Sequence, residues 1–158
     1  MIWQRVDELE ALRIAIQSEI DSYHMYREAI KHVQDKQGKE LLLALAEEEK
    51  RHRRELEREY ARISGKRLLY INLPKKRRFL KEITPTATPL EILTVAIAQE
   101  KDSLEFFETA AQRTSNLGGK RVFERLAEEE KHHMEMLEAE YRIRTKIEDG
   151  DLVSVAKG

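Results

Sequence analysis

An internal repeat covers most of this chain and limits the folds that are open to it. Residues 15–60 align without a gap on residues 96–141, at a constant offset of 81. The matched pairs include acidic, aromatic and turn positions: Glu19 with Glu100, Ser22 with Ser103, Tyr26 with Phe107, Gly38 with Gly119, Glu49 with Glu130, His52 with His133 and Tyr60 with Tyr141. A repeat of this kind is one supersecondary unit used twice. The chain should therefore contain two copies of the same unit.

Each copy has the pattern of two amphipathic helices. Apolar residues recur at steps of three and four, as in helices that bury one face, over residues of about 4–33, 39–64, 88–114 and 119–147. Between the copies lies a crossover connection, residues 65–87, and after them a tail, residues 148–158. We predict one all-α domain over residues 1–158, a four-helix bundle made of two helical hairpins joined by the long crossover.

Glycine, threonine and proline indicate the boundaries of these helices. Gly38 and Gly119 indicate the turns inside the two hairpins, and Gly65 indicates the end of the second helix. Thr88, followed by proline and by glutamate three residues later, has the pattern of a capping box. The third helix should therefore begin at this threonine.

Composition excludes several classes of protein. The 29 basic and 30 acidic residues give a net charge of −1, so we expect neither nucleic acid nor a membrane as partner. The absence of cysteine excludes thiolate zinc sites, iron-sulfur clusters and a Cys-ligated rubredoxin-type centre within this chain. No signal-peptide pattern and no run of about 18 apolar residues occurs. We therefore expect a soluble, cytoplasmic protein.

Four carboxylates and two imidazoles are the candidate metal ligands: Glu19, Glu49, His52, Glu100, Glu130 and His133. The motif Glu-x-x-His occurs twice, and on a helix it places both side chains on one face. Glu19 and Glu100 lie within apolar stripes, where a buried charge without a partner is costly. The midpoints between paired glutamates of each hairpin fall at or beside the predicted turns, so all six side chains should meet at one height.

This set, one Glu from each of two helices and Glu-x-x-His from each of the other two, is the ligand set of di-iron and di-manganese carboxylate bundles. Several carboxylates and one imidazole per metal favour iron or manganese over a closed zinc site. We expect two iron ions as cofactor, bridged by the four glutamates, with manganese or zinc as substitutes.

The ordered motif set resembles that of the rubrerythrin branch of the ferritin-like superfamily, over roughly residues 5–145. The resemblance implies a ferritin-like bundle whose di-iron centre acts on peroxide, dioxygen or Fe(II), as a peroxidase or ferroxidase. Rubrerythrins typically have a second carboxylate three residues after the third-helix ligand, and here that residue is Ser103. Related families often have Asp where this chain has Glu48 and Glu129. Without a rubredoxin domain, catalysis requires an external electron donor.

Several alternatives stay open at the level of sequence. Tyr26 is either a donor to a ligand carboxylate, or a radical relay, or an ordinary core residue. Glu48 and Glu129 either orient the histidine of the opposite motif or lie on the surface, and the basic residues 75–78 either dock an acidic electron-transfer protein or form a solvated loop. The chain could also be a non-catalytic iron-handling module, an oxygenase acting on an organic substrate or a metal-free structural bundle. We expect a homodimer.

Overall fold

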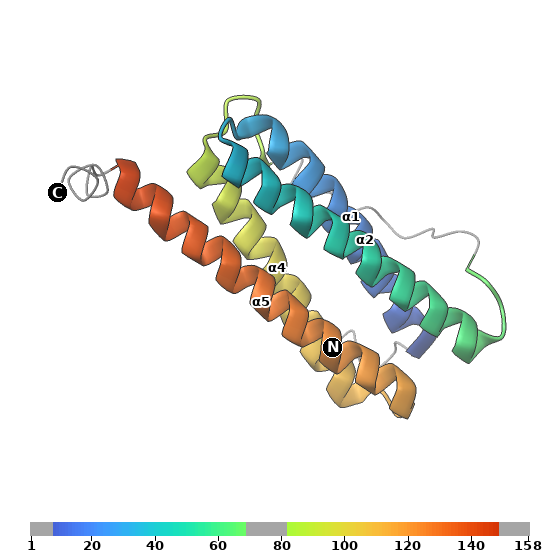
Figure 1. The fold of residues 1–158 in the computed structure, drawn as a ribbon. Helices are drawn as coiled ribbons and strands as arrows, with labels where there is room; N and C mark the ends of the chain where they lie inside the picture. The colour runs from blue at the N-terminus through green and yellow to red at the C-terminus, as the bar shows by residue number, and fades with distance from the viewer. Residues whose placement is uncertain (1–7, 69–81, 149–158) are drawn as a thin grey trace.

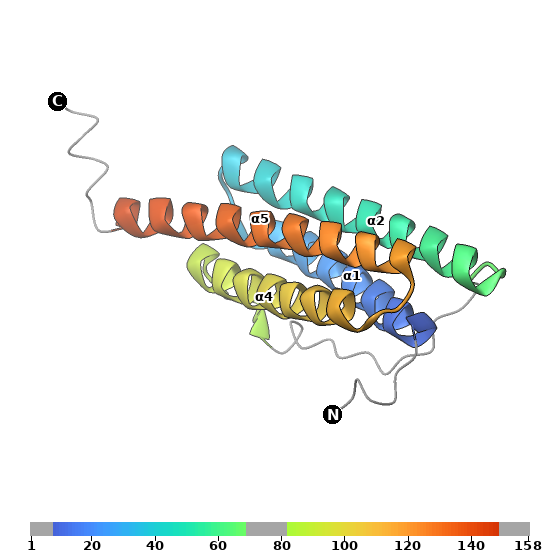
Figure 2. The same cartoon turned by 90° about the horizontal axis from the view of Figure 1, so that it is seen from below.

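The computed structural model describes residues 8–68 and 82–148, which form four long helices. These are α1 (Glu8–Ala29), α2 (Lys36–Ser64), α4 (Pro89–Arg113) and α5 (Leu117–Glu148), and a short 3-10 helix, η2 (Ile30–His32), follows α1. Helix α1 pairs with α2 and α4 pairs with α5, while α1 also packs on α4 and α2 on α5 (Figures 1 and 2). The predicted all-α bundle of two hairpins is confirmed.

The first hairpin ends and the second begins at opposite ends of the bundle. Helix α2 ends at one end and α4 starts at the other (Figure 1), and the predicted crossover lies between them in the sequence. Within this predicted crossover, residues 69–81 lie outside the described residues, and they include the basic residues 75–78. Residues 149–158 of the predicted tail also lie outside them. None of the described helices is both long and apolar enough to cross a membrane.

The second helix of each hairpin begins before its glycine. Helix α2 begins at Lys36 rather than 39, because the Asp35 side chain accepts a hydrogen bond from Gly38 N at 2.8 Å and caps the helix. Helix α5 begins at Leu117, and Asn116 accepts in the same way from Gly119 N at 3.0 Å. The glycines therefore lie in first helical turns. A Cβ at Gly38 would meet the Val33 and Asp35 side chains of the preceding turn and the end of the Arg144 side chain of α5, so glycine leaves room for these three side chains.

The other two boundary signals act as expected. Gly65 has φ 70°, in the left-handed region, and its N–H donates to Ala61 O at 2.9 Å, which ends α2. Thr88 Oγ1 accepts from Glu91 N at 3.2 Å, which caps α4 one residue before Pro89. These local contacts fix where both helices stop and start.

The interior has two apolar clusters with a polar layer between them. One cluster contains Tyr26, Leu42, Leu45, Ile92 and Leu137, and the other contains Leu12, Ile16, Leu56, Phe107 and Phe123. Along every helix the chain passes from one cluster to the other through buried polar residues: Glu19 and Ser22 in α1, Glu49 and His52 in α2, Glu100 and Ser103 in α4, and Glu130 and His133 in α5. Apolar packing on both sides thus holds the polar layer in place.

Candidate metal centre

The six candidate ligands lie together in the polar layer. Each of them is at most 1% exposed, although carboxylates and imidazoles are rarely buried so completely. The helical spacing of Glu-x-x-His places His52 beside Glu49 on α2 and His133 beside Glu130 on α5. Glu19 on α1 and Glu100 on α4 face them from the other two helices. The layer therefore gathers four carboxylates and two imidazoles away from water.

Two overlapping groups of four side chains have the spacing of metal sites. One group is Glu19, Glu49, His52 and Glu130, and the other is Glu49, Glu100, Glu130 and His133. Within each group, one ligand atom from every member lies within 4.8 Å of the others. Glu49 and Glu130 belong to both groups, whereas Glu19 and Glu100 belong to one group each. Glu49 and Glu130 thus lie between the two groups, and the expectation that all four glutamates bridge the metals stays a prediction.

Several carboxylate oxygens of the layer are buried and lack a hydrogen-bond donor: Glu19 Oε1 and Oε2, Glu49 Oε2, Glu100 Oε2 and Glu130 Oε2. Buried polar atoms in folded proteins nearly always have a partner, and leaving one without a partner is costly. Four of these oxygens lie 3.3–3.7 Å from a histidine Nδ1 without a hydrogen bond to it. A metal ion bound among the carboxylates and imidazoles would give these oxygens a partner. The residues present therefore fit a dinuclear metal centre.

Glu19 and Glu100, which each belong to only one of the two groups, have raised pKa values. Burial raises the pKa of Glu19 well above its usual range, and the neighbouring Glu49 and Glu130 raise it further. Burial and the charge of Glu130 likewise raise the pKa of Glu100 to about 8. In the metal-free protein, protons thus relieve part of the repulsion that a bound cation would relieve.

The two imidazoles are also held in their protonated form. Burial alone would lower the pKa of His52, but the adjacent carboxylates of Glu130, Glu19 and Glu49 raise it far above the ordinary value. The pKa of His133 is raised in the same way against the effect of burial, by Glu100, Glu130 and Glu49. Metal binding requires neutral imidazoles, so it should release these protons.

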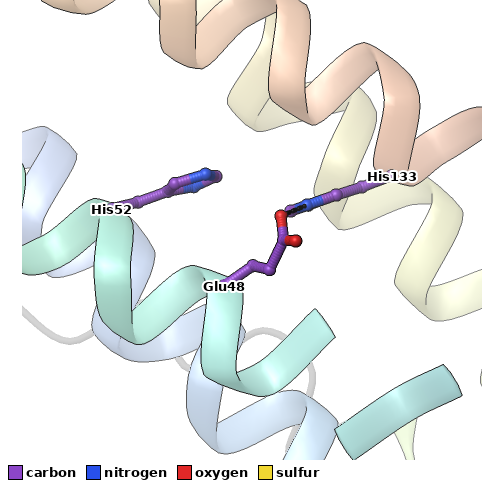
Figure 3. A group of neighbouring side chains, drawn as sticks. All are labelled: Glu48, His52 and His133. Atoms are coloured by element: carbon purple, nitrogen blue, oxygen red, sulfur yellow. Dashed lines mark hydrogen bonds and ion pairs between the residues drawn. The ribbon is translucent and has the colours of Figure 1, made fainter. Parts of the chain in front are cut away.

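Both histidines point the same ring nitrogen inward. His52 Nδ1 is 3.0 Å from Glu130 Oε1, and His133 Nδ1 is 3.1 Å from Glu49 Oε1. The rings approach one another from α2 and α5 (Figure 3) and stack at 5.5 Å between centroids, with 10° between their planes. The Nδ1 atoms are therefore the ones placed to bind metal.

Glutamates of the opposite helix contact the outer nitrogens. His52 Nε2 donates to Glu129 Oε2 at 2.6 Å, and His133 Nε2 donates to Glu48 Oε2 at 2.8 Å. Figure 3 shows Glu48 reaching from α2 to the ring of His133 on α5. The structure thus brings both glutamates to the positions that would orient the histidines of the opposite motif. A carboxylate in this position fixes the ring and makes it a stronger ligand.

Tyr26 breaks the twofold pattern of the site. Its hydroxyl, fully buried, donates a hydrogen bond to Glu100 Oε1, whereas the equivalent residue, Phe107, has no hydroxyl and packs beside Phe123. Burial and the charges of Glu100 and Glu49 raise the pKa of Tyr26. The contact fits the role of a donor to a ligand carboxylate.

Two contacts at the layer were not anticipated from the sequence. Arg51 on α2 donates to Glu129 at 2.5 Å, and the hydroxyls of Ser18 and Ser103 lie 3.3 Å apart, joining α1 to α4. Arg51 could have been suspected from its position three residues after Glu48, which puts it on the same helix face. The contact between Ser18 and Ser103 depends on how two distant helices pack, and the sequence contains no signal for it.

The chain matches a family model described as Rubrerythrin over residues 10–141. This range contains the whole repeat and all six candidate ligands. The chain belongs to the rubrerythrin family. Ser103 therefore stands in a rubrerythrin-family protein where a further carboxylate is typical, and its hydroxyl bonds to Ser18 instead.

Relatives of this rubrerythrin-family chain are found among curated proteins and solved structures. It is 30% identical to the uncharacterized protein YhjR of Bacillus subtilis over 122 residues, which is 77% of this chain and 78% of that protein. A hypothetical protein of Pyrococcus furiosus has a TM-score of 0.70 and 26% identity, over 87% of this chain and 89% of its own.

A bacterioferritin of Rhodobacter capsulatus, described as having a metal-free dinuclear site and haem iron, has a TM-score of 0.70 and 21% identity. The alignment covers 88% of this chain and 86% of the bacterioferritin. At this level of identity the likeness concerns the fold alone. It confirms that the bundle is ferritin-like.

Proposed function

We propose that the chain binds two iron ions in the polar layer and uses them in redox chemistry on peroxide, dioxygen or Fe(II). The two overlapping four-residue groups, with their buried carboxylate oxygens that lack donors, carry this proposal. Glu49 and Glu130 would bridge the ions, Glu19 and His52 would complete one position, and Glu100 and His133 would complete the other. A di-iron pair supplies two one-electron steps at adjacent atoms.

The chain's own residues would control the surroundings of the metals. Tyr26 donates to Glu100 and so holds that carboxylate in one orientation. Leu45 and Leu126, both almost fully buried, belong to the apolar clusters on the two sides of the layer and exclude water from it. Low water access strengthens the electrostatic interactions inside the site. The four glutamates would then hold the ions with little competition from solvent.

Repeated turnover would need a partner outside this chain. The sequence has no cysteine to hold a rubredoxin-type iron, so electrons would come from a separate donor. We also propose a homodimer as the assembly. Sedimentation equilibrium at micromolar concentration should give twice the 18.6 kDa mass of the chain, and a monomer mass would refute the dimer.

Metal content tests the site. Protein purified without added metal and then loaded with Fe(II) under anaerobic conditions should contain two metals per chain by elemental analysis. Because Glu49 belongs to both groups, Glu49→Ala should lose most of the binding of both ions. Glu47→Ala is a matched control on the same helix, since Glu47 is exposed. If Glu49→Ala retained two metals per chain, the assignment of the site would be wrong.

Reaction with oxidants separates catalysis from iron handling. When peroxide or dioxygen is added to the reduced, iron-loaded protein, the metal-centred absorbance should change at least about tenfold faster than with free Fe(II). This corresponds to an activation free energy lower by about 1.4 kcal/mol. Ser103, in the place of a typical carboxylate, is the observation that favours the second candidate, a module that carries iron without turnover. Oxidation no faster than that of free iron would support this second candidate.

A further inference from the structure

The outer side of the two histidines holds a charged network that the proposed function leaves unused. Arg51 Nη2 is 2.5 Å from Glu129 Oε2, the same oxygen that accepts from His52 Nε2. The same Nη2 is 3.6 Å from Glu48 Oε2, which accepts from His133 Nε2. One guanidinium therefore holds the carboxylate behind His52 closely and the carboxylate behind His133 only at a distance.

Other charges fix the position of this guanidinium. Arg51 Nη1 donates to Glu55 Oε1 at 3.0 Å, and the other oxygen of Glu55 accepts from Arg125 on α5 at 2.5 Å. Glu55 has a side chain only 15% exposed. The charge of Arg51 is met by Glu129 and Glu55 and, farther away, by Glu48, so the network adds no net positive charge beside the metal positions.

The second half of the repeat has no such network. The residues equivalent to Arg51 and Glu55 are His132 and Met136. His132 is exposed, and within residues 8–68 and 82–148 it forms no hydrogen bond or ion pair. The Glu48 side chain is 47% exposed, against 26% for Glu129. The Glu48 carboxylate that accepts from His133 is thus in contact with solvent. The Glu129 carboxylate that accepts from His52 is instead held by Arg51.

We propose that Arg51 is a positioning residue that makes the two metal positions unequal, so that the position of Glu19 and His52 fills before that of Glu100 and His133. The inference rests on the proposed dinuclear centre. A carboxylate behind a ligating imidazole fixes the ring, and its loss typically costs about 10–100-fold in metal affinity. By holding Glu129, Arg51 gives His52 this support.

Tyr26 acts in the same direction. It occupies one oxygen of Glu100, which leaves only the other oxygen free for a metal. Neither oxygen of Glu19 accepts a hydrogen bond, although Oε2 lies 3.4 Å from His52 Nδ1. The metal position of Glu19 and His52, which Arg51 supports, therefore also has the carboxylate with more oxygens that accept no hydrogen bond. Two independent departures from the repeat favour the same metal position.

The test is a titration of the metal-free protein with Co(II), followed by its visible absorption. The wild-type protein should bind two equivalents in two resolved steps. Arg51→Gln should weaken the first step by about tenfold or more and leave the second within about twofold. His132→Gln changes the equivalent residue of the other half and should alter neither step. Circular dichroism checks that the helices persist, which we expect because the Arg51 side chain is 45% exposed.

A second readout reports on the histidine itself. In the Co(II)-loaded protein, proton NMR should show two shifted ring N–H signals, and Arg51→Gln should speed the solvent exchange of the His52 signal alone. Single-step binding by the wild type, equal weakening of both steps, or unchanged steps in Arg51→Gln would overturn the role of Arg51. Failure of the wild type to bind Co(II) would instead refute the dinuclear site itself.

Discussion

A single hydroxyl distinguishes the surroundings of Glu19 from those of Glu100. Glu19 and Glu100 occupy equivalent places in the repeat, and both are fully buried. Tyr26 donates to Glu100, while Phe107 occupies the equivalent place in the other half and packs against Phe123. Two nearly identical halves therefore present unequal ligands, because a tyrosine and a phenylalanine of similar volume differ by one polar atom.

Removing this hydroxyl should destabilise the metal-free protein. Tyr26→Phe preserves the packing but leaves Glu100 without its donor, and a lost hydrogen bond to a buried group costs about 1–3 kcal/mol. Urea unfolding in the presence of a chelator measures this change. Tyr23→Phe is the control, because Tyr23 is only partly buried and contacts the ring of His24. Equal effects of the two substitutions would show that the contact between Tyr26 and Glu100 adds nothing.

At the level of the helices, each hairpin is fastened by an arginine from the other. Arg144 near the end of α5 donates to Asp35, the cap of α2, at 2.6 Å. Arg62 near the end of α2 donates to Asn116, before α5, at 2.7 Å. Each contact joins the C-terminal part of one helix to the start of another. The bundle ends are thereby closed by side chains from both hairpins.

The cap at Asp35, which also forms an ion pair, should stabilise the fold more than the cap at Thr88, which forms none. Asp35→Ala removes both the cap to Gly38 N and the ion pair with Arg144, and we expect a loss of about 1–2 kcal/mol in the free energy of unfolding. Thr88→Ala removes a cap without an ion pair and should cost about 1 kcal/mol. Adding Arg144→Ala to each variant gives the coupling, which should appear with Asp35 and be absent with Thr88.

Much of the helix arrangement could be predicted because the repeat and the apolar period are local properties of the chain. The six candidate ligands could be named for the same reason, from helical spacing and from distance to the turns. The start of α2 differs from the prediction because Asp35, three residues before Gly38, caps the helix. The ion pair of Asp35 with Arg144, more than a hundred residues away, could not be predicted from local sequence. The division into shared and single carboxylates, and the contact from Arg51 to Glu129, also depend on how α2 and α5 face each other.

For the whole molecule, burial of the polar layer lowers the free energy of unfolding, and bound metal would offset this loss. Apolar clusters on both sides stabilise the bundle, while buried carboxylates between them oppose folding unless they are protonated or bound to cations. A ligand that binds only the folded state stabilises it in proportion to the logarithm of its concentration over its Kd. Metal, protons and folding are therefore linked in this protein.

This linkage predicts opposite pH dependence with and without metal. In the metal-free fold the pKa of Glu19 is raised and that of Glu100 is raised to about 8, whereas an unfolded Glu has a pKa of about 4.3. The pKa values of His52 and His133 are also raised. The folded protein thus holds protons that the unfolded chain releases, so its stability should fall as pH rises from about 5.5 to 8.

The fall should reach about 1.4 kcal/mol per pH unit for each proton that only the folded state retains. With saturating Mn(II), which replaces these protons, stability should instead rise over the same range because metal binding releases protons. Urea unfolding at several pH values, with a chelator and with Mn(II), measures both slopes. If the metal-free protein became more stable as pH rose, these carboxylates and imidazoles would not hold extra protons in the folded state. The layer would then be more open to water than its burial indicates.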